Sequence, residues 1–117
     1  MQQLSPDLLK TSQCVIIQNA IVLKGLSLPD FEHATLWSKQ LLELLGLKYI
    51  ESEISADLIM VAAKFKDEML FLKLNYTLED MWFELAKHRE SLFFHLFDHI
   101  DANLMTIGLF NPALTIK

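Results

Sequence analysis

The sequence has a single cysteine, a single arginine, three glycines and three prolines among its 117 residues. One cysteine, Cys14, cannot form an internal disulfide or a Cys-based zinc site, which argues against a secreted, disulfide-rich scaffold. Fifteen acidic residues outnumber ten basic ones, and the net charge is −5. Because Arg89 alone carries the planar guanidinium that most often recognises phosphate and guanine, we expect no nucleic-acid partner.

Long hydrophobic runs are also missing. The longest clear one, at residues 58–63, is far shorter than the roughly 18 apolar residues that a membrane helix needs. The first residues lack the basic and apolar blocks of a signal peptide. We therefore expect a cytoplasmic protein with no membrane partner.

Sparse glycine and proline leave no candidate linker, so we expect one domain over residues 1–117, with a polar lead-in at 1–12 and a tail at 101–117. Apolar residues are abundant and make up 52% of the chain. That content is enough to bury a core in a chain of this length, and it leaves apolar side chains in surplus.

The first half of the sequence predicts extended chain followed by a helix. Residues 13–24 are rich in β-branched side chains and form either one long strand or a hairpin that turns at Gln18 and Asn19. A helix is expected over residues 28–45, because the Ser-Leu-Pro-Asp run at residues 27–30 is a helix start signal and Gly46 is a typical helix end.

The second half predicts strands and a long helix. A tight hairpin turn at residues 67–68 joins the last two expected strands, 58–66 and 69–76. A helix is expected to follow over residues 78–100, with a kink near 90–91. Residues 104–110 are expected to form a short strand or an apolar arm. The order β-α-β-β-β-α predicts an α+β fold, an antiparallel sheet of four or five strands with two helices packed on one face. The three consecutive strands are expected at 47–54, 58–66 and 69–76.

Histidines on the expected second helix form a candidate metal site. His88, His95 and His99 share one face of a helical wheel with Glu84. His95 and His99 are four residues apart, a spacing at which two imidazoles can share a zinc or nickel ion. The alternative is a polar helix border whose histidines bind nothing. Neither a Gly-x-Ser-x-Gly motif, a glycine-rich phosphate loop nor a His-Glu-x-x-His motif is present, so an enzyme is the less favoured class and no catalytic residue is assigned.

Surplus apolar side chains predict an interface. They lie on a second stripe of the expected second helix and on the far face of the sheet. The candidate interface residues are Phe83, Phe94, Phe97, Met60, Met69 and Phe71.

Three lysines project from the same predicted sheet face. Lys64, Lys66 and Lys73 are able to hold an anion or the acidic edge of a partner. The alternative is that these lysines only protect the sheet from aggregation.

One stretch of the chain resembles a known family. From Ala56 and Asp57 through residues 71–76 (Phe-Leu-Lys-Leu-Asn-Tyr) to residues 80–84 (Asp-Met-Trp-Phe-Glu), the sequence is similar to small bacterial proteins grouped as a domain of unknown function. The similar residues cover about a quarter of the chain. The resemblance implies a small cytoplasmic protein without an assigned activity, and no catalytic residue is carried over from it.

The sequence thus favours a non-enzymatic protein-interaction or assembly module that self-associates as a homodimer or binds another protein. The alternative is a protein that binds a metal or small ligand through the histidines, with an enzyme as one form of it.

Overall fold

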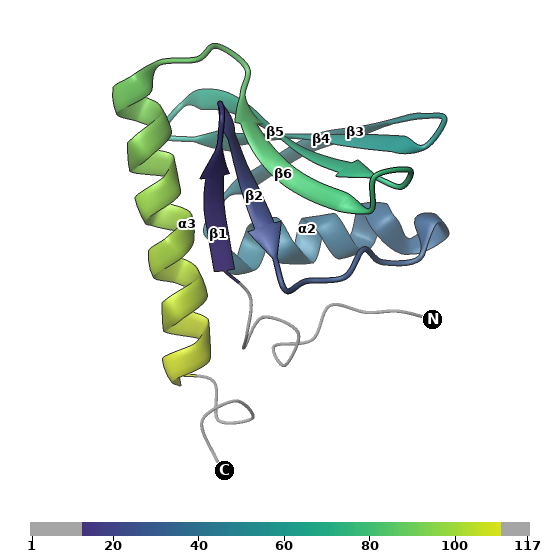
Figure 1. Cartoon of the computed structure of the whole chain (residues 1–117), viewed down its shortest axis with the longest axis horizontal. Coiled ribbons are helices and arrows are strands. Elements are labelled where there is room, and N and C mark those ends of the chain that lie inside the picture. The colour runs from purple at the N-terminus through teal and green to yellow at the C-terminus, as the bar shows by residue number, and fades with distance from the viewer. Residues whose placement is uncertain (1–12, 111–117) are drawn as a thin grey trace.

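The computed structural model describes residues 13–110, with the side chains of residues 13–105. In this range the chain forms a six-stranded antiparallel sheet and two α-helices, an α+β fold (Figure 1). The strand order is β1-β2-β6-β5-β4-β3. The elements are β1 (Gln13–Ile17), β2 (Ala20–Lys24), the 3-10 turn η1 (Phe31–His33), α2 (Ala34–Leu44), β3 (Lys48–Ser55), β4 (Leu58–Phe65), β5 (Glu68–Asn75), β6 (Asp80–Leu85) and α3 (Glu90–Phe110).

Both helices pack on the same face of the sheet. α2 contacts β3 and β4, and α3 contacts β1, which it follows along its length in Figure 1. The side chains of Trp37 and Leu41 on α2 and of Leu96 and Ile100 on α3 belong to one buried cluster with the inward-facing residues of the strands. This single apolar cluster is the core that holds the sheet and the helices together.

The first 12 described residues form a hairpin, so the structure decides between the two alternatives left open by the sequence. β1 pairs with β2 from Gln13 and Lys24 to Ile17 and Ala20. The two-residue turn places Gln18 at a φ of +55°. Within this hairpin β1 is the edge strand, and β2 continues the sheet by pairing with β6.

The first helix begins later than its start signal predicts. Leu28, Pro29 and Asp30 stay outside the helix, because Pro29 disfavours helical geometry at Leu28 and the Tyr76 hydroxyl donates to the Pro29 carbonyl at 2.7 Å. Asp30 has an extended ψ of 137° and makes no side-chain cap bond. The predicted helix end is confirmed at Gly46, which has a φ of +71°.

The turn predicted at residues 67–68 is displaced by one residue, which shifts the pairing of β4 with β5 by two. The turn is made by Lys66 and Asp67, so Phe65 faces Glu68 and Ala63 faces Leu70. A shift of two residues keeps every side chain on its predicted face, because strand side chains alternate with a period of two. The expected apolar core face therefore survives the change of register.

The long helix predicted at residues 78–100 is wrong. Residues Asp80–Leu85 form β6, and α3 begins only at Glu90. β6 pairs with β5 on one side and β2 on the other. The sheet consequently has six strands, not four or five. Residues 104–110, expected as a strand or arm, continue α3. In the described part of the chain, no helix combines the length and the apolar character needed to span a membrane.

Candidate functional site

The sheet face opposite the two helices, which we call the open face, is covered by none of the described elements. Its side chains alternate along each strand with those of the core. About half of them are apolar and gather toward the centre of the face, although the exposed face of an antiparallel sheet is usually polar. Met69 is 39% exposed, whereas Val22 and Ala62 are buried. The central residues of the open face are Val15, Val22, Trp82, Phe71, Met60 and Met69, with Lys73 and Glu84.

A polar contact occupies the middle of the open face. The Lys73 ammonium lies 3.2 Å from a Glu84 carboxylate oxygen, and the indole nitrogen of Trp82 donates to the same carboxylate. These side chains come from the neighbouring strands β5 and β6. Their polar groups satisfy one another, so the surrounding apolar surface is interrupted by no unpaired charge at this point. The predicted helix over residues 80–85 did not reveal this cluster, because the short pattern Asp-Met-Trp-Phe-Glu-Leu fits a helix as well as a strand.

The structure divides the candidate interface residues among three places. Met60, Met69 and Phe71 lie on the open face, next to one another on β4 and β5. Phe94 is 47% exposed on α3, and Phe97 is partly buried against the core from the same helix. Phe83 has no exposed surface. Its assignment to an interface is therefore corrected, because as a strand residue it points into the core.

The candidate metal residues are not brought together. Glu84 lies on the open face, whereas His95 and His99 lie on α3 at the other side of the sheet. The His99 Nε2 donates to the Leu45 carbonyl at 2.8 Å, and the His88 ring packs on Phe93. Over residues 13–105, no three His, Cys, Asp or Glu side chains are grouped as metal ligands. The shared face of the helical wheel disappears because Glu84 and His88 precede the helix.

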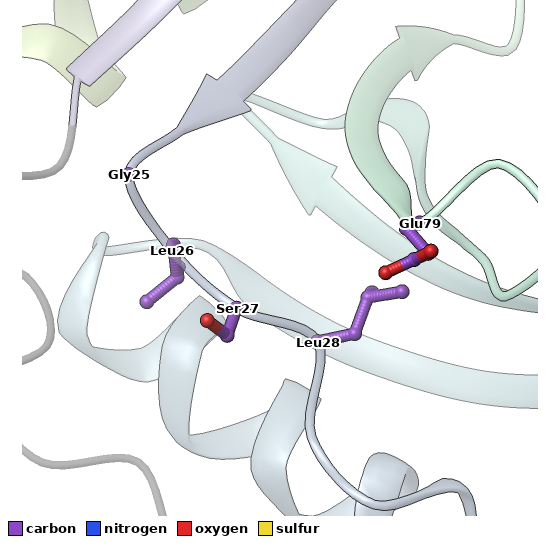
Figure 2. Close-up of a pocket in the computed structure, with 5 residues that line it drawn as sticks. All are labelled: Gly25, Leu26, Ser27, Leu28 and Glu79. Atoms are coloured by element: carbon purple, nitrogen blue, oxygen red, sulfur yellow. The ribbon is translucent and has the colours of Figure 1, made fainter.

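A pocket of about 540 Å³ lies beside the segment that leads from β2 to η1 (Figure 2). Gly25, Leu26, Ser27 and Leu28 line it on one side and Glu79 on the other. Figure 2 shows the Glu79 carboxylate close to the Leu28 side chain. Among the described residues that line it, Glu79 is the only titratable one, so these residues offer neither an acid-base pair nor a metal ligand set.

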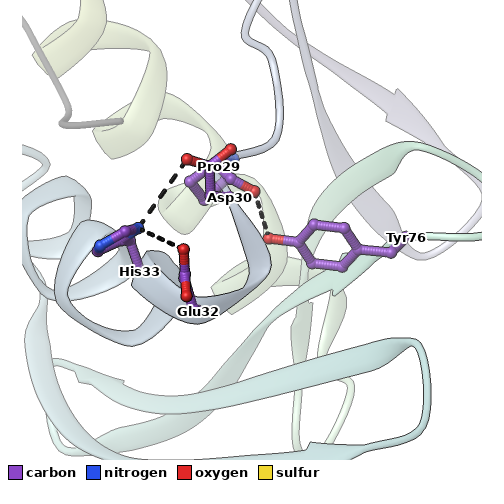
Figure 3. Close-up of polar contacts among 5 residues, drawn as sticks. All are labelled: Pro29, Asp30, Glu32, His33 and Tyr76. Atoms are coloured by element: carbon purple, nitrogen blue, oxygen red, sulfur yellow. Dashed lines mark hydrogen bonds and ion pairs between the residues drawn. The ribbon is translucent and has the colours of Figure 1, made fainter. Parts of the chain in front are cut away.

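Polar side chains also gather at the start of α2 (Figure 3). The His33 Nδ1 lies 3.9 Å from both an Asp30 and a Glu32 carboxylate oxygen, which is too long for a hydrogen bond. Tyr76 donates to the Pro29 carbonyl nearby, and burial, followed by the charge of Asp30, raises the pKa of Tyr76 to about 12. This cluster holds the chain in place ahead of the helix.

Cys14 is buried in β1, with its Sγ 3.9 Å from an Asp101 carboxylate oxygen on α3. Burial and, to a smaller extent, Asp101 raise the pKa of the Cys14 thiol from 9.0 to about 11. The native state therefore keeps this proton at pH values where the unfolded chain releases it. The corresponding stability is fully present below pH 9 and is lost as the pH rises toward 11.

We expect the free energy of unfolding to fall between pH 8.5 and pH 10, before the thiol titrates in the native state. The Cys14→Ala variant removes this group and should show a shallower fall. Denaturant titrations of both proteins across this pH range measure the difference. Parallel pH profiles for the two proteins would contradict the raised pKa of Cys14.

Comparison with protein families places these features in context. A family model described as "Protein of unknown function (DUF3630)" matches residues 5–97. The match extends over most of the chain, whereas the resemblance in the sequence rests on about a quarter of it. No curated protein and no solved structure matches the chain.

Proposed function

This chain belongs to the family described as Protein of unknown function (DUF3630), and we propose that it is an interaction module that self-associates through the open face. The observation that carries the proposal is the apolar character of that face. Lys73 on β5 lies between Trp82 on β6 and Met60 on β4. Phe71 precedes Lys73 on the same face of β5 and is diagonal to both, with Met69 next along the strand. Contiguous apolar patches of more than a few hundred Å² on a soluble protein usually mark interaction sites.

A second copy of the chain is the occupant that the charges favour. The chain as a whole carries a net charge of −5, so two copies repel each other unless they meet through a neutral surface. Strand alternation places equal numbers of both signs on the open face. These residues are Lys24, Lys48, Lys64 and Lys73 with Glu51, Glu53, Asp80 and Glu84. Because these charges balance, two copies can meet through this surface in a two-fold arrangement without net repulsion.

The centre of the open face can be buried without leaving a polar group unpaired. An unpaired charge is costly to bury, but Lys73 and Glu84 are already paired, and the Trp82 indole nitrogen has an acceptor. Trp, Phe and Met are residue types that are enriched at the centres of protein interfaces. Burial of this surface against a second copy therefore gains apolar contact without breaking an internal polar contact.

The Phe71→Glu variant tests the proposal. It places an unpaired carboxylate in the middle of the interface, which should weaken the dimer by at least about 3 kcal/mol, or about a hundredfold in dissociation constant. In sedimentation or light scattering, the native protein should have twice the chain mass of 13.5 kDa, and the variant should have the mass of one chain. Met69→Glu, at a more exposed position, provides a second variant.

Phe94→Glu is the matched control, because it makes the same chemical change at an exposed phenylalanine of α3. This variant should remain a dimer, and circular dichroism should show that all three variants are folded. A native protein that stays a monomer at high concentration would refute self-association. A dimer that survives Phe71→Glu and dissociates with Phe94→Glu would place the interface on α3 instead.

A further inference from the structure

A pocket of about 490 Å³ lies at the end of the sheet where β4 turns into β5 and α2 leads into β3. Lys48, Lys64 and Lys66 line it together with Gly46 and His99. We propose that this pocket binds a phosphate-type dianion, held by the three lysines. We call it the lysine pocket.

Two lysines of the lysine pocket lie opposite each other in the sheet, where their charges repel. Lys48 and Lys64 are direct partners across β3 and β4, and like charges in that position destabilise a sheet. No ion pair within the described residues neutralises either of them, although the chain has more acidic than basic residues. Lys73, the third lysine singled out in the sequence, differs from these two because Glu84 pairs with it. An anionic ligand would relieve the repulsion between Lys48 and Lys64.

The third charge is fixed by the backbone. Lys66 sits in the two-residue turn with a φ of +51°, a left-handed conformation that is unfavourable for a lysine. Its Nζ lies 5.4 Å from the centre of the Phe65 ring. Strain of this kind persists where the surrounding structure enforces it, and it is frequent at binding sites. The turn therefore keeps Lys66 at the rim of the lysine pocket.

The opposite wall is also held in place. The His99 ring packs 4.9 Å from the Phe65 ring, and its Nε2 donates to the Leu45 carbonyl. Gly46 has no side chain to fill the space, since a Cβ there would lie 3.1 Å from the His99 Nε2. These contacts give the lysine pocket one ordered wall, so that a small ligand meets a preformed surface on that side.

The charge of the lining indicates the class of ligand. The carboxylate of Asp67 also lines the lysine pocket and offsets one lysine, which leaves two positive charges in excess when His99 is uncharged. Phosphate and its monoesters carry close to two negative charges at neutral pH. Lysine binds phosphate as a point charge, whereas paired recognition of a carboxylate more often uses arginine. The single arginine, Arg89, is instead 3.5 Å from Glu68.

Titration with inorganic phosphate, followed by amide NMR at constant ionic strength, tests the proposal. The amide signals of Gly46, Lys48 and Lys66 should shift and saturate, and sodium chloride should not reproduce the shifts. The double variant Lys48→Gln/Lys64→Gln should weaken binding about tenfold, or about 1.4 kcal/mol, because it removes two of the three positive charges that hold the anion.

The double variant Lys39→Gln/Lys87→Gln removes the same charge from exposed lysines outside the lysine pocket and the open face, and it should bind phosphate within about twofold of the native protein. Amide spectra without phosphate show whether each variant is folded. Shifts that never saturate would overturn the proposal. Equal weakening in both double variants would overturn it as well, since it would show that phosphate responds only to total charge.

Discussion

Replacing Phe83 with alanine should lower the free energy of unfolding by about 3–5 kcal/mol, the largest effect that we expect from a single substitution. Phe83 is fully buried at the centre of β6. Its neighbours across the sheet are Leu72 on β5 and Ile21 on β2, both of which are also fully buried. Truncation would therefore open a cavity between strands that are far apart in the sequence, where the surroundings cannot easily collapse.

Denaturant unfolding at a fixed protein concentration measures this loss, since the proposed dimer would add a concentration-dependent contribution to stability. Phe94→Ala is the control, because the Phe94 side chain is 47% exposed and its truncation should cost about 1 kcal/mol or less. Similar losses for the two variants would contradict the central place of β6 in the sheet. They would instead favour the helical alternative, in which both residues lie on one exposed stripe.

The second large effect is expected from Gly46→Ala, at about 2–3 kcal/mol. Gly46 has a φ of +71°, and a residue with a Cβ adopts this region at a cost of about 1–2 kcal/mol. The new Cβ would also approach the His99 Nε2 to 3.1 Å. That contact disturbs the hydrogen bond from His99 to the Leu45 carbonyl, which contributes about another 1 kcal/mol.

A double-mutant cycle separates the two contributions. In a His99→Ala background the contact is absent, so Gly46→Ala should cost only the backbone strain of about 1–2 kcal/mol. Denaturant unfolding of the native protein, the two single variants and the double variant gives the coupling. Equal losses of unfolding free energy from Gly46→Ala in the two backgrounds would mean that His99 does not restrict the side chain at position 46. The cycle also examines one wall of the lysine pocket without using a ligand.

The candidate sites show how many of their residues the local sequence pattern predicts. Met60, Met69 and Phe71 were assigned correctly to the far face of the sheet, because alternation along a strand survives an error of two residues in register. Trp82 was missed as their neighbour, since it was placed on a helix. The lysine pocket was anticipated in part by Lys64 and Lys66, but its third lysine is Lys48 and not Lys73. Only the pairing of β3 with β4 brings Lys48 to that position.

The sequence by itself determined the α+β class, the helix that ends at Gly46 and the division of the strands into a core face and an open face. These features depend on local periodicity and on residues with special backbone preferences. Tertiary structure alone decided the state of residues Asp80–Leu85, whose apolar residues fit both a strand and a helix over so short a length. β2 and β5 both have backbone groups that need a partner, and β6 satisfies them by lying between the two. That long-range pairing places Phe83 in the core and Trp82 on the open face. It also separates Glu84 from the histidines of α3.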